Sequence, residues 1–212
     1  MSRAGSGPGP YRSARGRPRS EAVEQAILEG VIQLLEDGVP LADLSIERIA
    51  RTAGVGKAAI YRRWSGKENL YVDVIRAAEP SGPSDLELPG TSMRDDLVVL
   101  LESLRQRGVV SRSSAILRNV LAQMRTSPKI WAAYDARVTA PRRRLGLEVL
   151  HRGQVNGELR TDVDPELAID MLVGPMLMRS AMRPDADLPE GLAEQLVDGV
   201  LEGLRPVSSP GT

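Results

Sequence analysis

The sequence predicts an all-α fold of about nine helices, and three observations support this. Apolar residues recur at three- and four-residue spacing through most of the chain, which is the period of one helix face. Gly and Pro separate these stretches, and no segment alternates apolar and polar residues as a half-buried strand does. The 212 residues suffice for one or two domains, with a core of Leu, Ile, Val, Ala and Met because Phe is absent.

The first predicted helix covers residues 20–37. Ser20 can cap its N-terminus, because a serine hydroxyl accepts a hydrogen bond from a free backbone N–H of the first turn. Gly38 and Pro40 follow the last apolar residue and predict its end.

Residues 1–19 are predicted to form a disordered, Arg-rich arm. They hold five Arg and no acidic residue among many Gly, Pro and Ser, so they cannot bury enough apolar surface to fold. Residues 1–78 carry a net charge of +3 (12 Lys and Arg, 9 Asp and Glu), and residues 79–212 carry −3 (16 and 19). Positive charge at one end is typical of a nucleic-acid partner, and Arg side chains such as Arg17 and Arg19 suit a narrow minor groove. A solvated tail is the alternative interpretation.

Two short helices separated by a tight turn are predicted within residues 44–63. Ser45 is a favourable N-cap for the first helix, and apolar residues follow it at helical spacing. Gly54 stands where a chain that leaves a helix often adopts a positive φ. The second helix begins at Lys57, and Ile60 faces back toward the first. This arrangement is the helix-turn-helix pattern.

A third short helix follows at once and ends near residue 78. Ser65 and Glu68 have the spacing of a capping box, which predicts the helix start. Trp64, just before this start, is expected to pack beneath the second helix of the pair.

The second helix of the pair exposes side chains that suit a groove of DNA. Lys57 can donate to guanine or phosphate, Ala58 can contact a thymine methyl group, and Tyr61 can contact a phosphate or a sugar. A solvated charged face is the alternative. The candidate DNA contacts are Ser45, Lys57, Ala58, Tyr61, Arg62, Arg63 and Lys67, with Arg17 and Arg19 from the arm.

A set of motifs keeps fixed spacing through this region. The motifs are Ile49-Ala50, Ala53-Gly54-Val55, Ile60-Tyr61-Arg62, Trp64 and Lys67-Glu68-Asn69-Leu70. They resemble the DNA-binding domain of the TetR family of bacterial transcriptional regulators, and the resemblance spans residues 20–78. Gly56 and Ala59 depart from the family pattern, because the family often has hydroxyl-bearing residues at these places.

A Pro- and Gly-rich linker over residues 79–91 marks the predicted domain boundary. Residues 92–205 are predicted to form a second helical domain, and residues 206–212 a disordered tail. Pro141 is expected to kink one helix of this domain, and Gly174-Pro175 to interrupt another. The predicted helix starts in this domain are Ser92, Ser113, Ser127-Pro128, Asp164-Pro165 and Pro189.

The resemblance implies that the second domain joins two copies of the chain into a homodimer. Its final two helices are apolar on more than one face, which favours burial both inside the subunit and against a partner; a packed monomer is the alternative. A dimer would bind the two halves of a palindromic double-stranded DNA operator. The predicted interface residues are Leu172, Met176, Leu192, Leu196, Val200 and Leu204.

The resemblance also implies a small-molecule pocket among the helices between residues 92 and 182. Met is adaptable and often lines permissive pockets, although plain core packing is the alternative for each candidate. Few polar candidates are present besides Tyr134, Gln123, Asn119 and His151, so the expected effector is small and largely apolar. The candidate lining residues are Leu97, Leu101, Val120, Met124, Trp131, Tyr134, Met171 and Met178.

Composition argues against other classes of protein. The chain has no Cys and one His, His151, so neither a thiolate nucleophile nor a transition-metal site is expected. It also lacks a phosphate-binding Gly loop, and we assign no catalytic residue, metal or cofactor. No apolar run reaches the roughly 18 residues of a membrane helix, and no signal peptide is visible. A cytoplasmic protein without a membrane partner is expected.

The sequence therefore predicts a homodimeric transcriptional repressor that a small ligand releases from its operator. The alternative is a DNA-binding regulator without a small ligand, controlled by a protein partner or by its own concentration. A tight core without a pocket in residues 92–204 would favour that alternative. An enzyme is the least favoured class.

Overall fold

The computed structural model describes residues 17–79, 86–183 and 186–204, and every regular element within them is helical, which confirms the all-α prediction. Apart from a short 3-10 turn at Leu41–Asp43, these residues form nine continuous helical runs, since a π-helical segment joins α7 to α8. None of these helices is long and apolar enough to cross a membrane. The helices are α1 (Arg17–Glu36), α2 (Ile46–Thr52), α3 (Lys57–Tyr61), α4 (Lys67–Ala78), α5 (Met93–Val109), α6 (Ser111–Gln123), α7 (Pro128–Tyr134), α8 (Ala140–Val155), α9 (Pro165–Leu177) and α10 (Leu192–Leu204).

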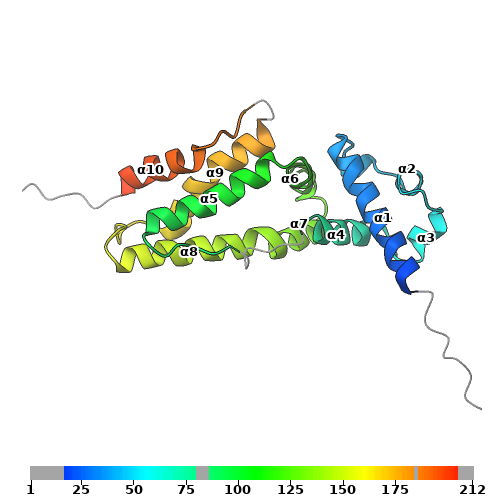
Figure 1. The fold of residues 1–212 in the computed structure, drawn as a ribbon, viewed down its shortest axis with the longest axis horizontal. Coiled ribbons are helices and arrows are strands. Elements are labelled where there is room, and N and C mark those ends of the chain that lie inside the picture. The colour runs from blue at the N-terminus through cyan, green and yellow to red at the C-terminus, as the bar shows by residue number, and fades with distance from the viewer. Residues whose placement is uncertain (1–16, 80–85, 184–185, 205–212) are drawn as a thin grey trace, which may run out of the picture.

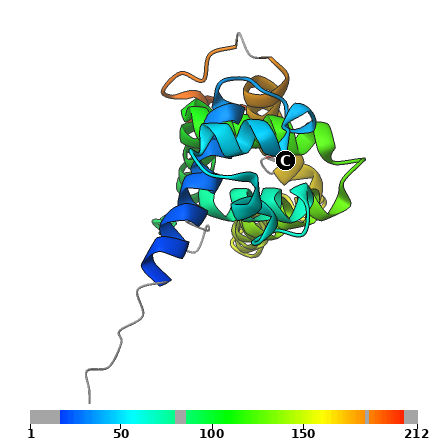
Figure 2. The same cartoon turned by 90° about the vertical axis from the view of Figure 1, so that its right-hand side faces the viewer.

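The molecule is elongated, with the first four helices at one end (Figure 1). We name α1–α4 the N-terminal domain and α5–α10 the C-terminal domain. Helices α2 and α3 are the outermost elements of the N-terminal end, while α5, α8, α9 and α10 bundle at the other end. Figure 2 looks directly onto the N-terminal domain, drawn in blue to cyan.

The start of α1 differs from the prediction. The helix begins at Arg17, three residues before Ser20, so Ser20 lies inside it and does not cap it. Pro18 is compatible with this earlier start, because the first helical turn needs no backbone N–H donor. Arg17 and Arg19 therefore belong to the backbone of α1, and their side chains lie outside the described part of the chain. Residues 1–16 and 206–212, predicted as arm and tail, also lie outside it.

The helix-turn-helix forms as predicted. The Ser45 hydroxyl accepts a hydrogen bond from the Arg48 backbone N–H at 3.1 Å and caps α2. Gly54 adopts φ +66°, a conformation that residues with a side chain seldom tolerate, and so allows the tight turn. Ile60 is buried beneath α3.

The predicted capping box of α4 is wrong. Gly66 occupies the N-cap position, and no side chain caps the helix. The Ser65 hydroxyl instead accepts a hydrogen bond from the Asn69 side-chain amide at 2.6 Å. The spacing of Ser65 and Glu68 was correct for a capping box, but the helix starts at Lys67, one residue later than that motif requires.

Three helix boundaries in the C-terminal domain also differ from the prediction. α6 starts at Ser111 rather than Ser113, and α10 starts at Leu192 because Gly191, at φ +80°, turns the chain just before it. α9 runs through Gly174-Pro175 without interruption. Leu172 and Met176 are buried on either side of this dipeptide, and their packing compensates for the hydrogen bond that Pro175 cannot make.

Pro141 is accommodated by a change of helix type. The five residues Asp135–Thr139 form a π-helical segment that leads directly into α8. A π segment widens the turn, which makes room for a ring that lacks a backbone N–H donor. A second π segment, Met178–Met182, extends α9.

The buried core of the N-terminal domain continues into α6 and α7. Residues of α1 and α4 pack in one cluster with Ile116, Val120 and Ile130. The Leu41 backbone N–H donates to the Asn119 side chain at 2.8 Å, which fixes the 3-10 turn onto α6. The two domains therefore share a core across the predicted boundary.

A second core joins α5, α8, α9 and α10. Gly153 on α8 lets α5 approach closely, because a Cβ there would lie 2.1 Å from the Met93 sulfur. Gly146 plays the same part for α9, where a Cβ would lie 2.6 Å from Ile169 Cδ1. The two glycines place α8 between its neighbours.

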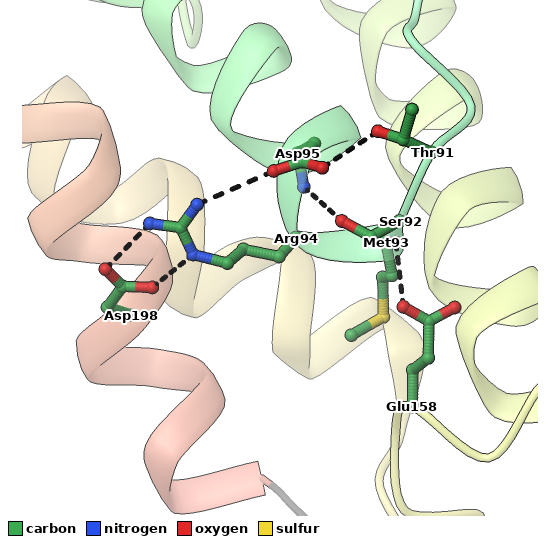
Figure 3. A network of polar contacts seen from close by, with 7 residues as sticks. All are labelled: Thr91, Ser92, Met93, Arg94, Asp95, Glu158 and Asp198. Atoms are coloured by element: carbon green, nitrogen blue, oxygen red, sulfur yellow. Dashed lines mark hydrogen bonds and ion pairs between the residues drawn. The ribbon is translucent and has the colours of Figure 1, made fainter.

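A polar network fixes the start of α5, as Figure 3 shows. The Ser92 hydroxyl caps the helix by accepting from the Asp95 backbone N–H at 3.1 Å, which confirms the predicted helix start. Arg94 donates twice to Asp198 of α10, at 2.6 and 2.9 Å. Glu158, from the loop after α8, accepts from the Met93 backbone N–H at 2.9 Å. The start of α5 is thereby tied to both neighbouring segments.

Asp96 is a charged residue with no solvent exposure. Its carboxylate accepts from the Gly90 backbone N–H at 2.8 Å and pairs with Arg152 of α8. A buried carboxylate is stable only when hydrogen bonds and an opposite charge compensate its lost hydration. Asp96 thus fastens the end of the linker and the C-terminal part of α8 to α5.

We expect Asp96→Ala to lower the free energy of unfolding by about 2 kcal/mol, because the Gly90 N–H loses its acceptor and the half-exposed Arg152 loses its ion-pair partner. Chemical denaturation followed by circular dichroism measures this. Asp162→Ala is the matched control, since Asp162 also pairs with an arginine, Arg160, but at the surface. Equal effects of the two substitutions would contradict a structural role for burial of Asp96.

Candidate functional site

The exposed face of α3 carries most of the predicted DNA contacts. Lys57, Ala58, Tyr61 and Arg62 are exposed, and Tyr61 has 62% of its surface open to solvent. Tyr61 is thus a large aromatic side chain that lies mostly in solvent and not in the core. Because α3 is one of the outermost elements of the N-terminal end (Figure 1), its exposed side chains can approach a large partner.

Lys57 forms an ion pair with Glu47 of α2 at 3.3 Å. Both side chains are mostly exposed, so water and salt screen the pair and its contribution to stability is small. The pair can therefore open when Lys57 meets a stronger partner such as a phosphate or guanine.

Arg63 has a structural partner that the sequence did not reveal. Its guanidinium donates to the Ser20 carbonyl and hydroxyl oxygens, each at 3.0 Å, and to the Ala59 carbonyl oxygen at 2.9 Å. These hydrogen bonds hold the end of α3 against the start of α1. Arg63 thus positions α3, and it is less available for DNA than predicted.

Trp64 packs beneath α3, as predicted. It is buried, and its indole N–H donates to the Asp73 carboxylate of α4 at 2.9 Å. Two other candidates, Ser45 and Lys67, are exposed at the first residues of α2 and α4. The N-terminal domain thus presents α3 and two helix starts from a common scaffold.

A cavity of about 180 Å³ lies among α5, α6, α7, α8 and α9. Both π segments border it, which agrees with the frequent occurrence of such segments at functional sites. The rings of Trp131 and Tyr134 lie on its wall with centroids 6.5 Å apart. The lining residues are Leu100, Leu101, Leu104, Arg107, Gly108, Ser113, Ser114, Leu117, Leu121, Trp131, Tyr134, Val138, Thr139, Arg142, Arg143, Ile169, Val173, Met176, Leu177 and Ser180.

Three of the eight predicted pocket residues line this cavity, namely Leu101, Trp131 and Tyr134. Leu97 and Val120 do not line this cavity and are buried in the two cores. Met124, Met171 and Met178 do not line it either, and they are 40%, 43% and 47% exposed.

Three arginines on the cavity wall were missed, Arg107, Arg142 and Arg143. A signal for one of them was present in the sequence, since Tyr134, Val138 and Arg142 follow one another at four-residue spacing and so share a helix face. That spacing places Arg142 on the same side as the two predicted residues Trp131 and Tyr134.

An apolar stripe runs along the outer face of α9 and the π segment after it. Leu167, Met171, Met178 and Met182 are 58%, 43%, 47% and 71% exposed. Gly174 is exposed between them, and a Cβ there would meet no atom within 4 Å. The spacing of four, three, four and four residues keeps all five on one side of the helix.

The predicted interface residues mostly lie elsewhere. Leu172, Met176 and Leu192 are buried within the subunit, so they have little surface to offer a partner. Leu196 and Val200 on α10 are partly buried, and the side chain of Leu204 lies outside the described residues. The residues that α9 exposes, such as Met171, are one position away in sequence from the predicted interface residues, such as Leu172.

No metal centre is apparent in the described part of the chain, where no three His, Cys, Asp or Glu residues gather closely enough to hold an ion. The structure offers three surfaces that suit recognition, namely the exposed face of α3, the cavity and the α9 stripe.

Comparison with known proteins agrees with this geometry. Residues 37–74 match the family model described as bacterial regulatory proteins, tetR family, and residues 89–200 match the tetracyclin repressor-like C-terminal domain. The chain is 29% identical over 199 residues to the uncharacterized HTH-type transcriptional regulator YdeS of Bacillus subtilis (strain 168), covering 93% of this chain and 98% of that relative.

Solved structures show the same fold. A TetR family transcription regulator, SCO0332, is 30% identical with a TM-score of 0.56, covering 87% of this chain and 99% of that one. The transcriptional regulator FadR from Bacillus subtilis, solved in complex with stearoyl-CoA, has a TM-score of 0.70 at 14% identity, covering 85% and 99%. The two matched domains, found in the expected order around an exposed helix-turn-helix, show that this chain belongs to the TetR family of transcriptional regulators, a non-enzymatic family with an N-terminal DNA-binding domain.

Proposed function

We propose that this regulator is a homodimeric repressor that a small ligand releases from a palindromic operator. The observation that carries the proposal is the presence of a lined cavity in the C-terminal domain, whose helices share a buried core with the DNA-binding domain. A regulator without a small ligand would be expected to fill this space with side chains, because protein interiors are otherwise close-packed.

The α9 stripe supports the dimer. Its five residues present a continuous apolar surface, and Leu196 and Val200 add partly exposed apolar surface on the neighbouring helix α10. Contiguous exposed apolar patches usually mark interaction sites. Two copies joined through α9 and α10 would place two α3 helices for two half-sites, which lie about 34–36 Å apart or a multiple of that distance.

The contacts of α6 support communication between cavity and DNA. This helix contributes Ser113, Ser114, Leu117 and Leu121 to the cavity, while its Arg112 pairs with Glu29 of α1. A ligand that favours one arrangement of α6 would therefore also favour one position of the DNA-binding domain, which is a shift between two populations. The FadR neighbour, solved with stearoyl-CoA, shows that the fold can accommodate a ligand.

We expect Lys57→Ala and Tyr61→Ala each to weaken specific DNA binding by about 5- to 150-fold, because each removes about 1–3 kcal/mol of contact energy. Both side chains are exposed, so circular dichroism should stay native. Fluorescence anisotropy with DNA from around the protein's own coding region, across salt concentrations, measures the effect. Arg144→Ala, an exposed arginine on α8, is the control and should bind as the wild type does. Wild-type affinity in both α3 variants would exclude α3 as the recognition helix.

We expect Met171→Lys combined with Met178→Lys to convert the dimer into a monomer, since two charges would face the apolar partner surface. Sedimentation equilibrium measures the mass, and the monomer should also lose its preference for palindromic DNA. Met124→Lys is a matched control, because Met124 is equally exposed but belongs to the end of α6. A dimer that survives the double substitution would place the interface on another face.

A further inference from the structure

Two arginines of the cavity wall, Arg107 and Arg142, belong to a cluster of charged side chains that also includes Glu79. Arg107 from α5 pairs with Glu79, the residue that ends α4, and Glu79 is 2% exposed. The electrostatic influence of Arg107 and of Arg142 also reaches the Tyr134 hydroxyl, so the three side chains lie close together. This cluster thus holds two guanidinium groups and one carboxylate.

Arg142 is the unmatched cation of this cluster. Its one hydrogen bond goes to the Val138 carbonyl oxygen of its own helix at 3.2 Å, and its buried Nε has no acceptor. Within the described residues no carboxylate forms an ion pair with it. Burial lowers the pKa of this guanidinium and the neighbouring positive charge of Arg107 lowers it further, while the charges of Glu79 and Tyr134 only partly offset these effects.

The third arginine on the wall differs in this respect. Arg143 pairs with Glu166 and with Asp170, the latter at 2.6 Å, and both partners belong to α9. Its charge is therefore matched within the protein. Arg142 and Arg143 are adjacent in sequence and border the same cavity, so they form a natural pair of test and control positions.

We propose that the effector is an anionic amphiphile, a compound with one carboxylate and an apolar body, and that its carboxylate binds Arg142. This proposal deepens the proposed function by naming the chemical class of its ligand. A partly buried guanidinium with free donors is a strong site for a carboxylate, because its planar fork matches the two oxygens. The remaining wall is mostly Leu, Ile, Val, Met and Trp, which suits an apolar body.

The position of Arg142 connects this ligand to the DNA-binding domain. An anion there would lie beside the Arg107–Glu79 pair, and Glu79 also accepts a hydrogen bond at its carbonyl oxygen from Arg137 of the π segment, at 2.7 Å. Arg107 would then interact with two carboxylates rather than one, so its hold on the end of α4 would weaken. The charge of the ligand, and not only its volume, would act on the position of the DNA-binding domain.

Direct binding tests the proposal without DNA. Medium-chain acids from hexanoate to dodecanoate, together with 2-naphthoate, are titrated against their methyl esters, with Trp131 fluorescence and calorimetry as readouts. We expect at least one acid to bind the wild type about tenfold tighter than its ester. Arg142→Gln should remove this preference while leaving ester binding intact, and Arg143→Gln should retain it. Absence of binding by every acid, equal binding of acid and ester, or an undiminished preference in Arg142→Gln would overturn the proposal.

Thermal unfolding of the unliganded variants provides a second measurement. Arg142→Gln should have a Tm at or above that of the wild type, because it removes a charge that the protein does not compensate. A lower Tm would show that the protein itself satisfies Arg142, and would also overturn the proposal.

DNA binding separates this inference from the proposed function. If an acid binds but leaves the DNA affinity unchanged, only the proposal of ligand-released repression is contradicted. If the protein represses without a ligand and binds none of the acids, only the proposal of an anionic ligand is contradicted.

Discussion

The packing of α6 and α7 against α1 and α4 is the constraint on which the rest of the structure depends. The core of the DNA-binding domain does not close on itself, because residues such as Ile116 and Ile130 from the other domain complete it. The same two helices form part of the cavity wall. A change in the packing of these helices at the cavity would therefore also change the contacts that hold the DNA-binding domain.

The N-terminal domain was largely predictable, because its signals are local. Ser45 caps α2, Gly54 permits the turn and Ile60 marks the inner face of α3, and each conclusion needs only a few neighbouring residues. Two details of this domain were not predicted. The capping box at Ser65 was misplaced by one residue, and Arg63 was assigned to DNA because its partner Ser20 lies 43 residues away in sequence.

The helices of the C-terminal domain could be predicted from the sequence, but the faces that these helices bury could not. α9 is apolar nearly all round, so its sequence alone cannot distinguish the side that carries Leu172 and Met176 from the side that carries Met171 and Met178. The tertiary structure decides between them, since α5 and α8 cover the first side. This one-residue difference in register explains why predicted pocket residues lie on the outer stripe and predicted interface residues in the core.

The expectation of a largely apolar effector was based on the few polar candidates and left charged residues out, because Arg is normally a surface residue. Around the cavity this rule does not hold, since three arginines on the wall come from α5 and α8 and only two of them have carboxylate partners. A positive charge on Arg142 that no carboxylate of the described residues pairs with costs free energy on burial. Evolution can retain such a free-energy cost where ligand binding recovers it. The interaction of Arg142 lacks a carboxylate in the protein, and the ligand can supply that carboxylate. On this argument the cavity is selective through its unmatched charge, and its apolar wall contributes affinity that many compounds could share.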